Sequence, residues 1–379
     1  MVYQKRLETF QTALTESADL AFFPISADLQ YLTGIPRDVP NFGRVMHPGE
    51  WVEGMWVAPN KSPVVTLPRM TAEFGGRELT GVDVRVLGDF DDPQTFLADI
   101  LKGFNLPKQP RIALGDSTGS QTVAHLHVMY PEASFISGTD ILRPQRMIKE
   151  ASEVELMQQA GEITESAFKE VLKQLRHGMT ELDIIAEVNY QLRKHGSLGP
   201  SFTTSLYNTG PNMPLNFNRM ETWKRRLRPP CSVLFDFGAI HEGYCYDFGR
   251  TVSFGEPKSE FSLIHSLVME SQAKGIEAMQ AGHITTSEVD AAARNVIEGS
   301  GYGPQFRHRL GHSIGLDVHE PPFLTMGDDT VLQNGMMFTV EPSIIQDQGF
   351  SARVEDIVVI EDGKARKLTK GFQDLFVVD

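Results

Sequence analysis

The chain has 379 residues, of which 41% are hydrophobic and 22% charged, and its formal net charge is −14. This composition supports sizeable cores and argues against disorder, and the length leaves room for two domains. The acidic balance excludes a nucleic-acid partner, because phosphate binding requires a basic face. No stretch reaches the ~20 apolar residues of a membrane span, residues 1–10 lack a signal-peptide core, and two cysteines are too few for a disulfide framework, so we expect a cytoplasmic protein.

The first 145 residues alternate helix and strand patterns. Apolar residues at Leu7, Phe10 and Leu14 predict an amphipathic helix, and a further helix is expected at residues 93–101. Interleaved strands and helices indicate an α/β layer domain over residues 1–145. Short apolar runs predict its buried strands at residues 20–25, 55–58, 64–67, 82–87 and 112–114.

A second domain is predicted over residues 146–379. Residues 143–148 combine proline, charge and weak periodicity, which indicates a linker. The helix that follows is expected to begin after Ser152, with Glu155 as its capping-box partner, and to end near Leu175. Strand-like runs dominate later in the chain, with further helices predicted at residues 180–195, 260–279 and 287–298.

Two β-prone runs flank a short polar turn at residues 240–243, which predicts a β-hairpin. If the turn is centred between residues 241 and 242, Asp236 and Asp247 lie directly opposite each other, with Cβ atoms about 5 Å apart. Two carboxylates among aromatic neighbours would repel each other and lose solvation unless a cation lies between them. The same register places Gly238, and not the other cysteine, opposite Cys245, so we expect no disulfide across this hairpin.

A second hairpin is predicted near the C-terminus. Residues 337–341 lead through a polar turn that ends at Gly349 into residues 350–360. A three-residue turn would place Glu341 opposite Glu355, although a bulge could shift that register. Between the two hairpins, a glycine-rich segment supplies three imidazoles, those of His308, His312 and His319.

These residues together indicate a metal site. Taken singly, a strand carboxylate is more often structural or solvated, and a histidine in an apolar run is more often a core residue. Four carboxylates and an imidazole suit Mn, Co or Zn, and not copper or an iron–sulfur cluster. Two such ions about 3.5–4 Å apart acidify a bridging water and polarise a carbonyl oxygen, which is the chemistry of hydrolysis. We therefore predict a dinuclear-metal hydrolase with the ligands Asp236, Asp247, His312, Glu341 and Glu355.

The sequence resembles the aminopeptidase P and prolidase family, whose catalytic domain has the pita-bread fold and follows a creatinase-type domain. The resemblance covers nearly the whole chain. Arg6-Leu7 and Tyr31-Leu32-Thr33-Gly34 are similar to the creatinase-type domain, and Arg146-Met147-Ile148-Lys149 is similar to the entry to the catalytic domain. Its most specific motifs are Asp236, Asp247, Gly311-His312-Ser313-Ile314-Gly315, Glu341-Pro342 and Arg353-Val354-Glu355-Asp356.

The resemblance implies how the metals are held. Asp236 would bind one ion, His312 and Glu341 would bind the other, and Asp247 and Glu355 would bridge the two. Manganese would be the first choice of metal, with cobalt or zinc as alternatives. The family also implies a homodimer.

The resemblance further implies catalytic roles. Glu341 would act as the general base or proton shuttle for the bridging water. His319 would steady the tetrahedral intermediate, His308 would be a further pocket histidine, and Arg353 would support the final glutamate.

The chain departs from the family pattern in its substrate pocket. Family peptidases place a histidine after a Gly-x-Asn segment, whereas Asn216 and Phe217 stand at that point here. Residues 343–345 replace the glycine and tyrosine that the family favours after Glu-Pro. An altered pocket beside intact metal ligands predicts weak activity on simple Xaa-Pro dipeptides. The alternative is that Phe217 only fills the core and that a histidine from elsewhere, such as His308, replaces the missing one.

Three functions remain open. The first is an Xaa-Pro peptidase of the aminopeptidase P or prolidase type. The second is a hydrolase of a small non-peptide C–N substrate, like creatinase or ectoine hydrolase, which the altered pocket favours somewhat. The third is a non-catalytic binding module, which the retained acids disfavour because buried acids without a metal are costly. The expected partner is a small peptide or small-molecule amide, with neither nucleic acid nor membrane.

Overall fold

The computed structural model describes residues 2–37, 48–74 and 82–378 and divides into two compact units. The described residues up to Arg146 form the first unit, and the second begins at Met147. Residues 143–147, predicted as part of a linker, instead complete helix α6 (Gly138–Met147). The helix persists there because Leu142 and Arg146, one turn apart, are both buried, and Arg146 pairs with Asp28.

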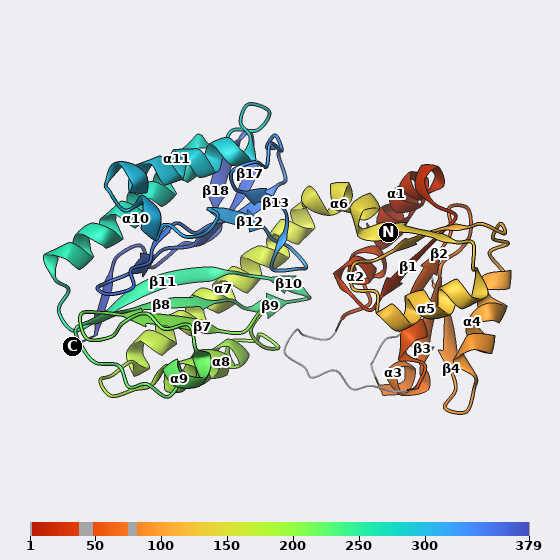
Figure 1. Cartoon of the computed structure of the whole chain (residues 1–379), viewed down its shortest axis with the longest axis horizontal. Helices are drawn as coiled ribbons and strands as arrows, with labels where there is room; N and C mark the ends of the chain where they lie inside the picture. Colours follow the sequence, from red (N-terminus) through yellow and green to blue (C-terminus); the bar gives the residue numbers. More distant parts are fainter. Residues whose placement is uncertain (1, 38–47, 75–81, 379) are drawn as a thin grey trace. The chain divides into compact units, whose positions relative to one another are not determined.

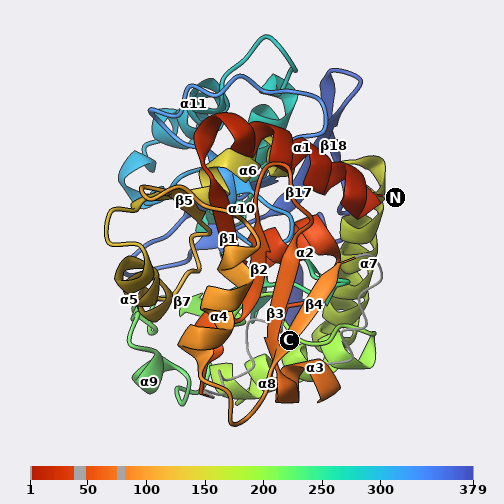
Figure 2. The ribbon, with the colours of Figure 1, turned by 90° about the vertical axis from the view of Figure 1, so that its right-hand side faces the viewer.

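The first unit is a mixed β-sheet with helices (Figure 1 and Figure 2). Its strands are β1 (Leu20–Pro24), β2 (Gly54–Val57), β3 (Val64–Pro68), β4 (Asp83–Leu87), β5 (Arg111–Leu114) and β6 (Ser134–Ser137). Their order in the sheet is β4-β3-β2-β1-β5-β6. The other helices are α1 (Val2–Ser17), α2 (Ala27–Thr33), α3 (Arg69–Phe74), α4 (Pro93–Lys102) and α5 (Ser120–Met129).

Adjacent residues of β1 show that helices cover both faces of this sheet. Phe22 belongs to a buried cluster with Trp56 and with side chains of α4 and α5. Phe23 points the other way, where it contacts Phe10 of α1 edge-on, with ring centroids 5.3 Å apart. The predicted α/β class is confirmed.

The second unit contains two larger sheets (Figure 1). The four-stranded sheet has the order β19-β11-β8-β7 and consists of β7 (Ser205–Thr209), β8 (Cys231–Phe237), β11 (Phe248–Phe254) and β19 (Phe376–Val378). The five-stranded sheet has the order β13-β12-β14-β17-β18 and consists of β12 (Gly311–Ser313), β13 (Glu320–Leu324), β14 (Met337–Val340), β17 (Asp356–Glu361) and β18 (Lys364–Lys367). Two short ribbons pair β9 (Ile240–His241) with β10 (Tyr244–Cys245) and β15 (Ser343–Ile344) with β16 (Ala352–Arg353).

A pair of long helices packs with each of these sheets. Phe168 of α7 (Ala151–Gln174), which packs with α8 (Glu181–Lys194), contacts Phe235 and Phe248 edge-on, both at 5.3 Å between ring centroids. Helices α10 (Ser259–Ala278) and α11 (Thr286–Gly299) share a buried cluster with Phe338 and Val358 of the other sheet. The remaining short helices are η1 (Glu50–Val52), α9 (Arg219–Thr222) and η2 (Gly303–Gln305).

The helices predicted at residues 93–101, 180–195, 260–279 and 287–298 match α4, α8, α10 and α11 within one residue at each end, but the start of α7 differs from the prediction. Helices α2, α3, α5 and α9 were not predicted. The predicted capping box of Ser152 and Glu155 is wrong, because α7 begins earlier and Glu150 is its N-cap. The backbone N–H of Glu150 donates to the Glu153 carboxylate at 2.9 Å, so a glutamate fills the position expected for serine. In the part of the chain that the structure describes, no helix is long and apolar enough to cross a membrane.

Candidate metal centre

Asp236 and Asp247 come from the first predicted hairpin. Glu242 and Gly243 have positive φ angles of 49° and 84°, so the turn is centred between them. Asp236 therefore lies opposite Gly249, and the predicted direct opposition of the two aspartates is wrong by two residues. A shift of two residues leaves side chains on the same face, and the carboxylates of Asp236 and Asp247 still come together.

The same shift changes the partner of one cysteine. Cys245 pairs across the hairpin with Ile240, and not with Gly238 as predicted. Cys231 lies opposite Phe254, at the other end of β8. Neither cysteine forms a disulfide, which confirms that part of the prediction.

The glycine opposite Asp236 makes room for a third carboxylate. A Cβ atom on Gly249 would lie only 2.8 Å from Cβ and from Oε2 of Glu355. The backbone N–H of Glu355 donates to the Gly249 carbonyl at 2.9 Å, in an isolated bridge between the two sheets. This bridge places Glu355 against the acids of the first hairpin.

Glu341 is the fourth carboxylate, and its position confirms the predicted register of the second hairpin. The ladder between β14 and β17 precedes it, and the ladder between β15 and β16 follows it. Both ladders have the same register, which sets Glu341 opposite Glu355 where the regular pairing is interrupted. No bulge shifts the two glutamates apart.

His312 on β12 points an unprotonated nitrogen at these acids. Its Nδ1 lies 3.0 Å from the carbonyl oxygen of Ser313, so we assign the ring proton to Nδ1. Its Nε2 lies 3.4 Å from a carboxylate oxygen of Glu341 and 3.6 Å from one of Asp247. Burial lowers the pKa of His312 to about 3, so the ring is neutral, which is the form that binds metals.

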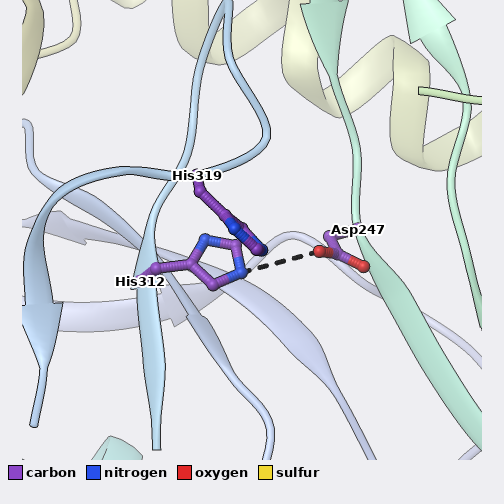
Figure 3. A group of neighbouring side chains, drawn as sticks. All are labelled: Asp247, His312 and His319. Carbon is purple, nitrogen blue, oxygen red and sulfur yellow. Dashed lines mark ion pairs between the residues drawn. The ribbon is translucent and has the colours of Figure 1, made fainter. Parts of the chain in front are cut away.

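His319 joins the centre from the segment between β12 and β13 (Figure 3). Its ring centroid lies 4.1 Å from that of His312. Ligand atoms of His319, His312 and Asp247 all lie within 4.8 Å of one another. The sequence predicted a stabilising role and no coordination, and the structure places the ring close enough for either.

The potential ligands form one continuous cluster. Three sets of ligand atoms each lie within 4.8 Å, and they share members. Asp247 and Glu355 each belong to a set that contains Asp236 and to another that contains His312. The sets are Asp247, His312 and His319; His312, Glu341 and Glu355; and Asp236, Asp247 and Glu355.

The charge of this cluster fits bound cations. Among the described residues, Oδ1 of Asp247 and both carboxylate oxygens of Glu355 are buried without a hydrogen-bond partner. Burial, and then the neighbouring carboxylates, raise the pKa of both groups well above the usual range. Arg353 supplies one positive charge, 2.7 Å from Asp236 and 3.4 Å from Glu341. One guanidinium cannot balance three buried carboxylates and the partly buried Asp236, whereas two divalent ions can.

Comparison with known proteins identifies the family. Residues 155–362, more than half of the chain, match the model of metallopeptidase family M24. The chain is also 31% identical to an Xaa-Pro dipeptidase of Lactobacillus delbrueckii subsp. lactis, over 98% of both chains. The chain belongs to metallopeptidase family M24.

Solved structures agree with this assignment. The M24 protein is similar to a dipeptidase from Pyrococcus horikoshii OT3, with a TM-score of 0.87 and 29% identity over 98% of this chain and all of that one. It is similar to a prolidase from Thermococcus sibiricus, with a TM-score of 0.88 and 26% identity over both whole chains. The predicted family, pita-bread fold and metal-dependent hydrolase class are confirmed, and the non-catalytic module is not supported.

His308 of this M24 enzyme is held by contacts outside the cluster. Its Nδ1 lies 2.7 Å from the carbonyl oxygen of Arg309, and its Nε2 lies 2.5 Å from Oγ of Ser343. Burial lowers its pKa to about 4, so the ring is neutral. Ser343 is one of the departures from the family pattern, and its hydroxyl orients this histidine. The pocket role of His308 stays a prediction.

Asn216 and Phe217 precede α9. The Asn216 amide donates to Glu221 at 3.0 Å, and its carbonyl oxygen accepts from the N–H of Asn218 at 2.8 Å. Phe217 is 64% exposed and contacts Tyr207 edge-on, with ring centroids 6.1 Å apart. These contacts keep both side chains within their own segment and β7.

Arg219 of the M24 enzyme was not singled out by the sequence. Its guanidinium donates to Oγ of Ser205 at 3.0 Å, and Ser205 is the β7 partner of Asp236. Burial raises the pKa of Asp236, and the charges of Arg353 and Arg219 oppose that rise. No sequence motif predicts that Arg219 lies near Asp236, because this proximity depends on the register between β7 and β8.

A buried ion pair supports the segment that carries His319. Nζ of Lys149 lies 3.0 Å from the carboxylate of Glu320, and their side chains are only 1% and 7% exposed. A Cβ atom on Gly315 would lie 3.0 Å from both side chains, so glycine is needed for this approach. The pair fixes the residue next to His319, and sequence reasoning missed it because the partners lie 171 positions apart.

Proposed function

We propose that this protein hydrolyses Xaa-Pro dipeptides with two divalent metal ions. The observation that carries the proposal is the cluster of overlapping ligand sets around buried carboxylate oxygens without partners. The substrate class is supported by similarity to an Xaa-Pro dipeptidase over nearly the whole chain. Creatinase-like hydrolysis of a small C–N compound is the second candidate, favoured by the residues at 216, 217 and 343–345.

In this proposal Asp236 would hold one ion, His312 and Glu341 would hold the other, and Asp247 and Glu355 would be shared between them. A shared acid has to lie close to the ligands of both ions. Asp247 and Glu355 each belong to one ligand set with Asp236 and to another with His312, which supports this assignment. The oxygen-rich set with one imidazole suits manganese first, with cobalt or zinc as alternatives. Measurement of bound metal after reloading with each ion tests this order.

The remaining residues have separable tasks. Bound divalent ions would polarise the scissile carbonyl and provide a water acidic enough to attack it at neutral pH. Glu341 takes a proton from that water and passes it to the proline nitrogen as the C–N bond breaks. Arg353 contacts both Glu341 and Asp236, which orients the base. His319 hydrogen-bonds the oxygen on which negative charge develops.

A substrate panel tests the function. The metal-loaded protein is incubated with Xaa-Pro dipeptides, matched Xaa-Ala dipeptides, longer peptides and small guanidino or amide compounds. We expect cleavage of Xaa-Pro dipeptides and little of the matched Xaa-Ala compounds. Cleavage of the guanidino or amide compounds alone would assign the chain to the second candidate function.

The altered pocket gives a separate prediction. Phe217→His is expected to raise kcat/KM for Xaa-Pro dipeptides by about 3- to 10-fold, which is what one added hydrogen bond contributes. The exposure of Phe217 makes the change tolerable for the fold. Phe217→Leu, which adds no donor, should leave the value nearly unchanged. Equal activity of the His and Leu variants would show that position 217 does not contact substrate.

The assembly and location of the enzyme rest on the resemblance and on composition. A homodimer and a cytoplasmic location both stay predictions. Neither is needed for the metal centre, because all five proposed ligands come from one unit of one chain.

A further inference from the structure

A buried glutamine connects the two strands that carry the glutamates of the proposed metal centre. Gln272 lies on α10 and is 1% exposed. Its Nε2 donates to the carbonyl oxygen of Val340 at 3.0 Å and to that of Val354 at 3.3 Å. These two valines directly precede Glu341 and Glu355. One side-chain amide therefore holds both sides of the second hairpin, each directly before a proposed ligand.

Lys367 fixes the orientation of the Gln272 amide. Nζ of Lys367, on β18, donates to Oε1 of Gln272 at 2.9 Å. A primary amide donates only through its nitrogen and accepts only through its oxygen, and an ammonium group can only donate. The amide oxygen therefore faces Lys367, which leaves the two N–H groups for the two carbonyls.

Each glutamate follows a peptide group that is held at both ends. The N–H of Glu341 donates to the Leu310 carbonyl at 2.8 Å. The N–H of Glu355 donates to the Gly249 carbonyl at 2.9 Å. The carbonyls of the same two peptide groups accept from Gln272. Because a peptide group is planar, bonds at its two ends restrict the backbone from which each glutamate side chain extends.

The regular ladder of this hairpin is interrupted where the glutamates lie. The pairing of β14 with β17 ends at Val340, and the pairing of β15 with β16 resumes at Ser343. The common register of the two ladders sets Pro342 opposite Val354. Proline has no N–H, so it cannot donate to the Val354 carbonyl. Helix α10 supplies a donor at this point through Gln272.

We propose that Gln272 is a positioning residue that keeps the two glutamates at the spacing needed to hold metal ions. This inference rests on the proposed function, in which both glutamates are ligands. Glu341 and Glu355 form one ligand set with His312, whose ligand atoms lie within 4.8 Å of one another. Carboxylates this close repel each other before a cation is bound. A link between the two preceding carbonyls resists that separation and preorganises the site.

Titration of the metal-free, full-length protein with Mn²⁺, followed by calorimetry, tests this inference. Gln272→Glu keeps the side-chain length and the contact with Lys367 but replaces the donor nitrogen with an acceptor. Gln272→Asn keeps the amide, withdraws it by one methylene and should fold. Each variant is expected to weaken Mn²⁺ binding by about 10- to 100-fold, the usual effect of losing a group that orients a metal ligand. KM for an Xaa-Pro dipeptide at saturating Mn²⁺ should stay nearly unchanged, because Gln272 acts on the main chain.

Ser271→Ala is the matched control. Ser271 precedes Gln272, is also buried, and donates to the Ala293 carbonyl of α11 at 2.7 Å. Its loss should lower the Tm of the metal-free protein and leave Mn²⁺ binding at the parent value. Parental Mn²⁺ affinity in either Gln272 variant would overturn the inference. Equally weak binding by Ser271→Ala would also overturn it, because a general loss of stability would then explain the effect. A parent protein that binds no Mn²⁺ would instead refute the proposed metal centre, and the inference with it.

Discussion

Glu355→Ala is expected to lower kcat/KM by at least about 10³-fold and to remove most of both metal ions. Glu355 belongs to a ligand set on each side of the centre, so its loss removes a bridge rather than one ligand of one ion. Asp247→Ala should behave in the same way for the same reason. Elemental analysis of reloaded protein and assay of Xaa-Pro cleavage measure the two effects.

Two further variants separate loss of metal from loss of fold. Glu361 is the last residue of β17, the strand that follows Glu355, and its exposed side chain pairs with Arg366, so Glu361→Ala should keep both ions and full activity. Glu355→Gln replaces a buried acid whose pKa is raised by burial and by neighbouring carboxylates. Its metal-free Tm should equal or exceed that of the metal-free parent protein. A Glu355→Ala protein that is folded, active and loaded with two ions would disprove the bridging role.

His319→Ala is expected to lower kcat by about 10²-fold or more while metal content stays nearly unchanged. The proposed role of His319 is a hydrogen bond to the developing negative charge, which matters only during the reaction. The measurements are kcat, KM and the number of bound ions in the same preparation. His283→Ala, at an exposed position before α11, is the control and should match the parent enzyme.

The same experiment decides between the two roles that the structure allows for His319, metal ligand and stabiliser of the developing charge. Its ring nitrogen lies within 4.8 Å of ligand atoms of His312 and Asp247. Loss of an ion together with activity would make His319 a ligand. Unchanged turnover would rule out both roles.

The parts of the fold that could be predicted are the elements with clear periodicity. The 3.6-residue pattern of α1 follows from burial of one helix face, and the apolar runs of β1, β2 and β3 follow from burial along nearly their whole length. The start of α7 was missed because a glutamate takes the N-cap position, which propensity assigns to serine. A linker was predicted where α6 ends, because burial of Arg146 against Asp28 sustains a helix that the local sequence does not indicate.

In the metal centre, the face on which hairpin residues lie could be predicted from the sequence more securely than their exact register. A register shift of two residues leaves every side chain of a hairpin on the same face, and only an odd shift changes the face, so Asp236 and Asp247 still lie on one face despite an error of two residues. The exact register depends on where the turn is centred. Glu242 has a positive φ angle in this turn, but glutamate is not a residue type that predicts such a turn position. In the second hairpin the predicted register was correct.

Residues that support the ligands could not be predicted in this way. Arg219 reaches Ser205 across β7, and Arg309 rests on Phe323 across β12 and β13. Each of these relationships depends on which strands are neighbours in a sheet. Strand order is a tertiary property, and no local pattern in one sequence specifies it.

The buried pair of Lys149 and Glu320 also sets the limits of an autonomous catalytic fragment. The region shared with the family, residues 155–362, contains every proposed metal ligand. Lys149 lies before that region, and Lys367, which binds Asp356 at 2.8 Å, lies after it. A fragment trimmed to the shared region would leave buried Glu320 without its lysine, at a cost of about 3–5 kcal/mol. It would also remove one of the two cations that face Asp356, which keeps Arg250 at 2.6 Å. Exchange of catalytic domains between relatives therefore has to carry these flanking lysines along, although they lie outside the part by which the family is recognised.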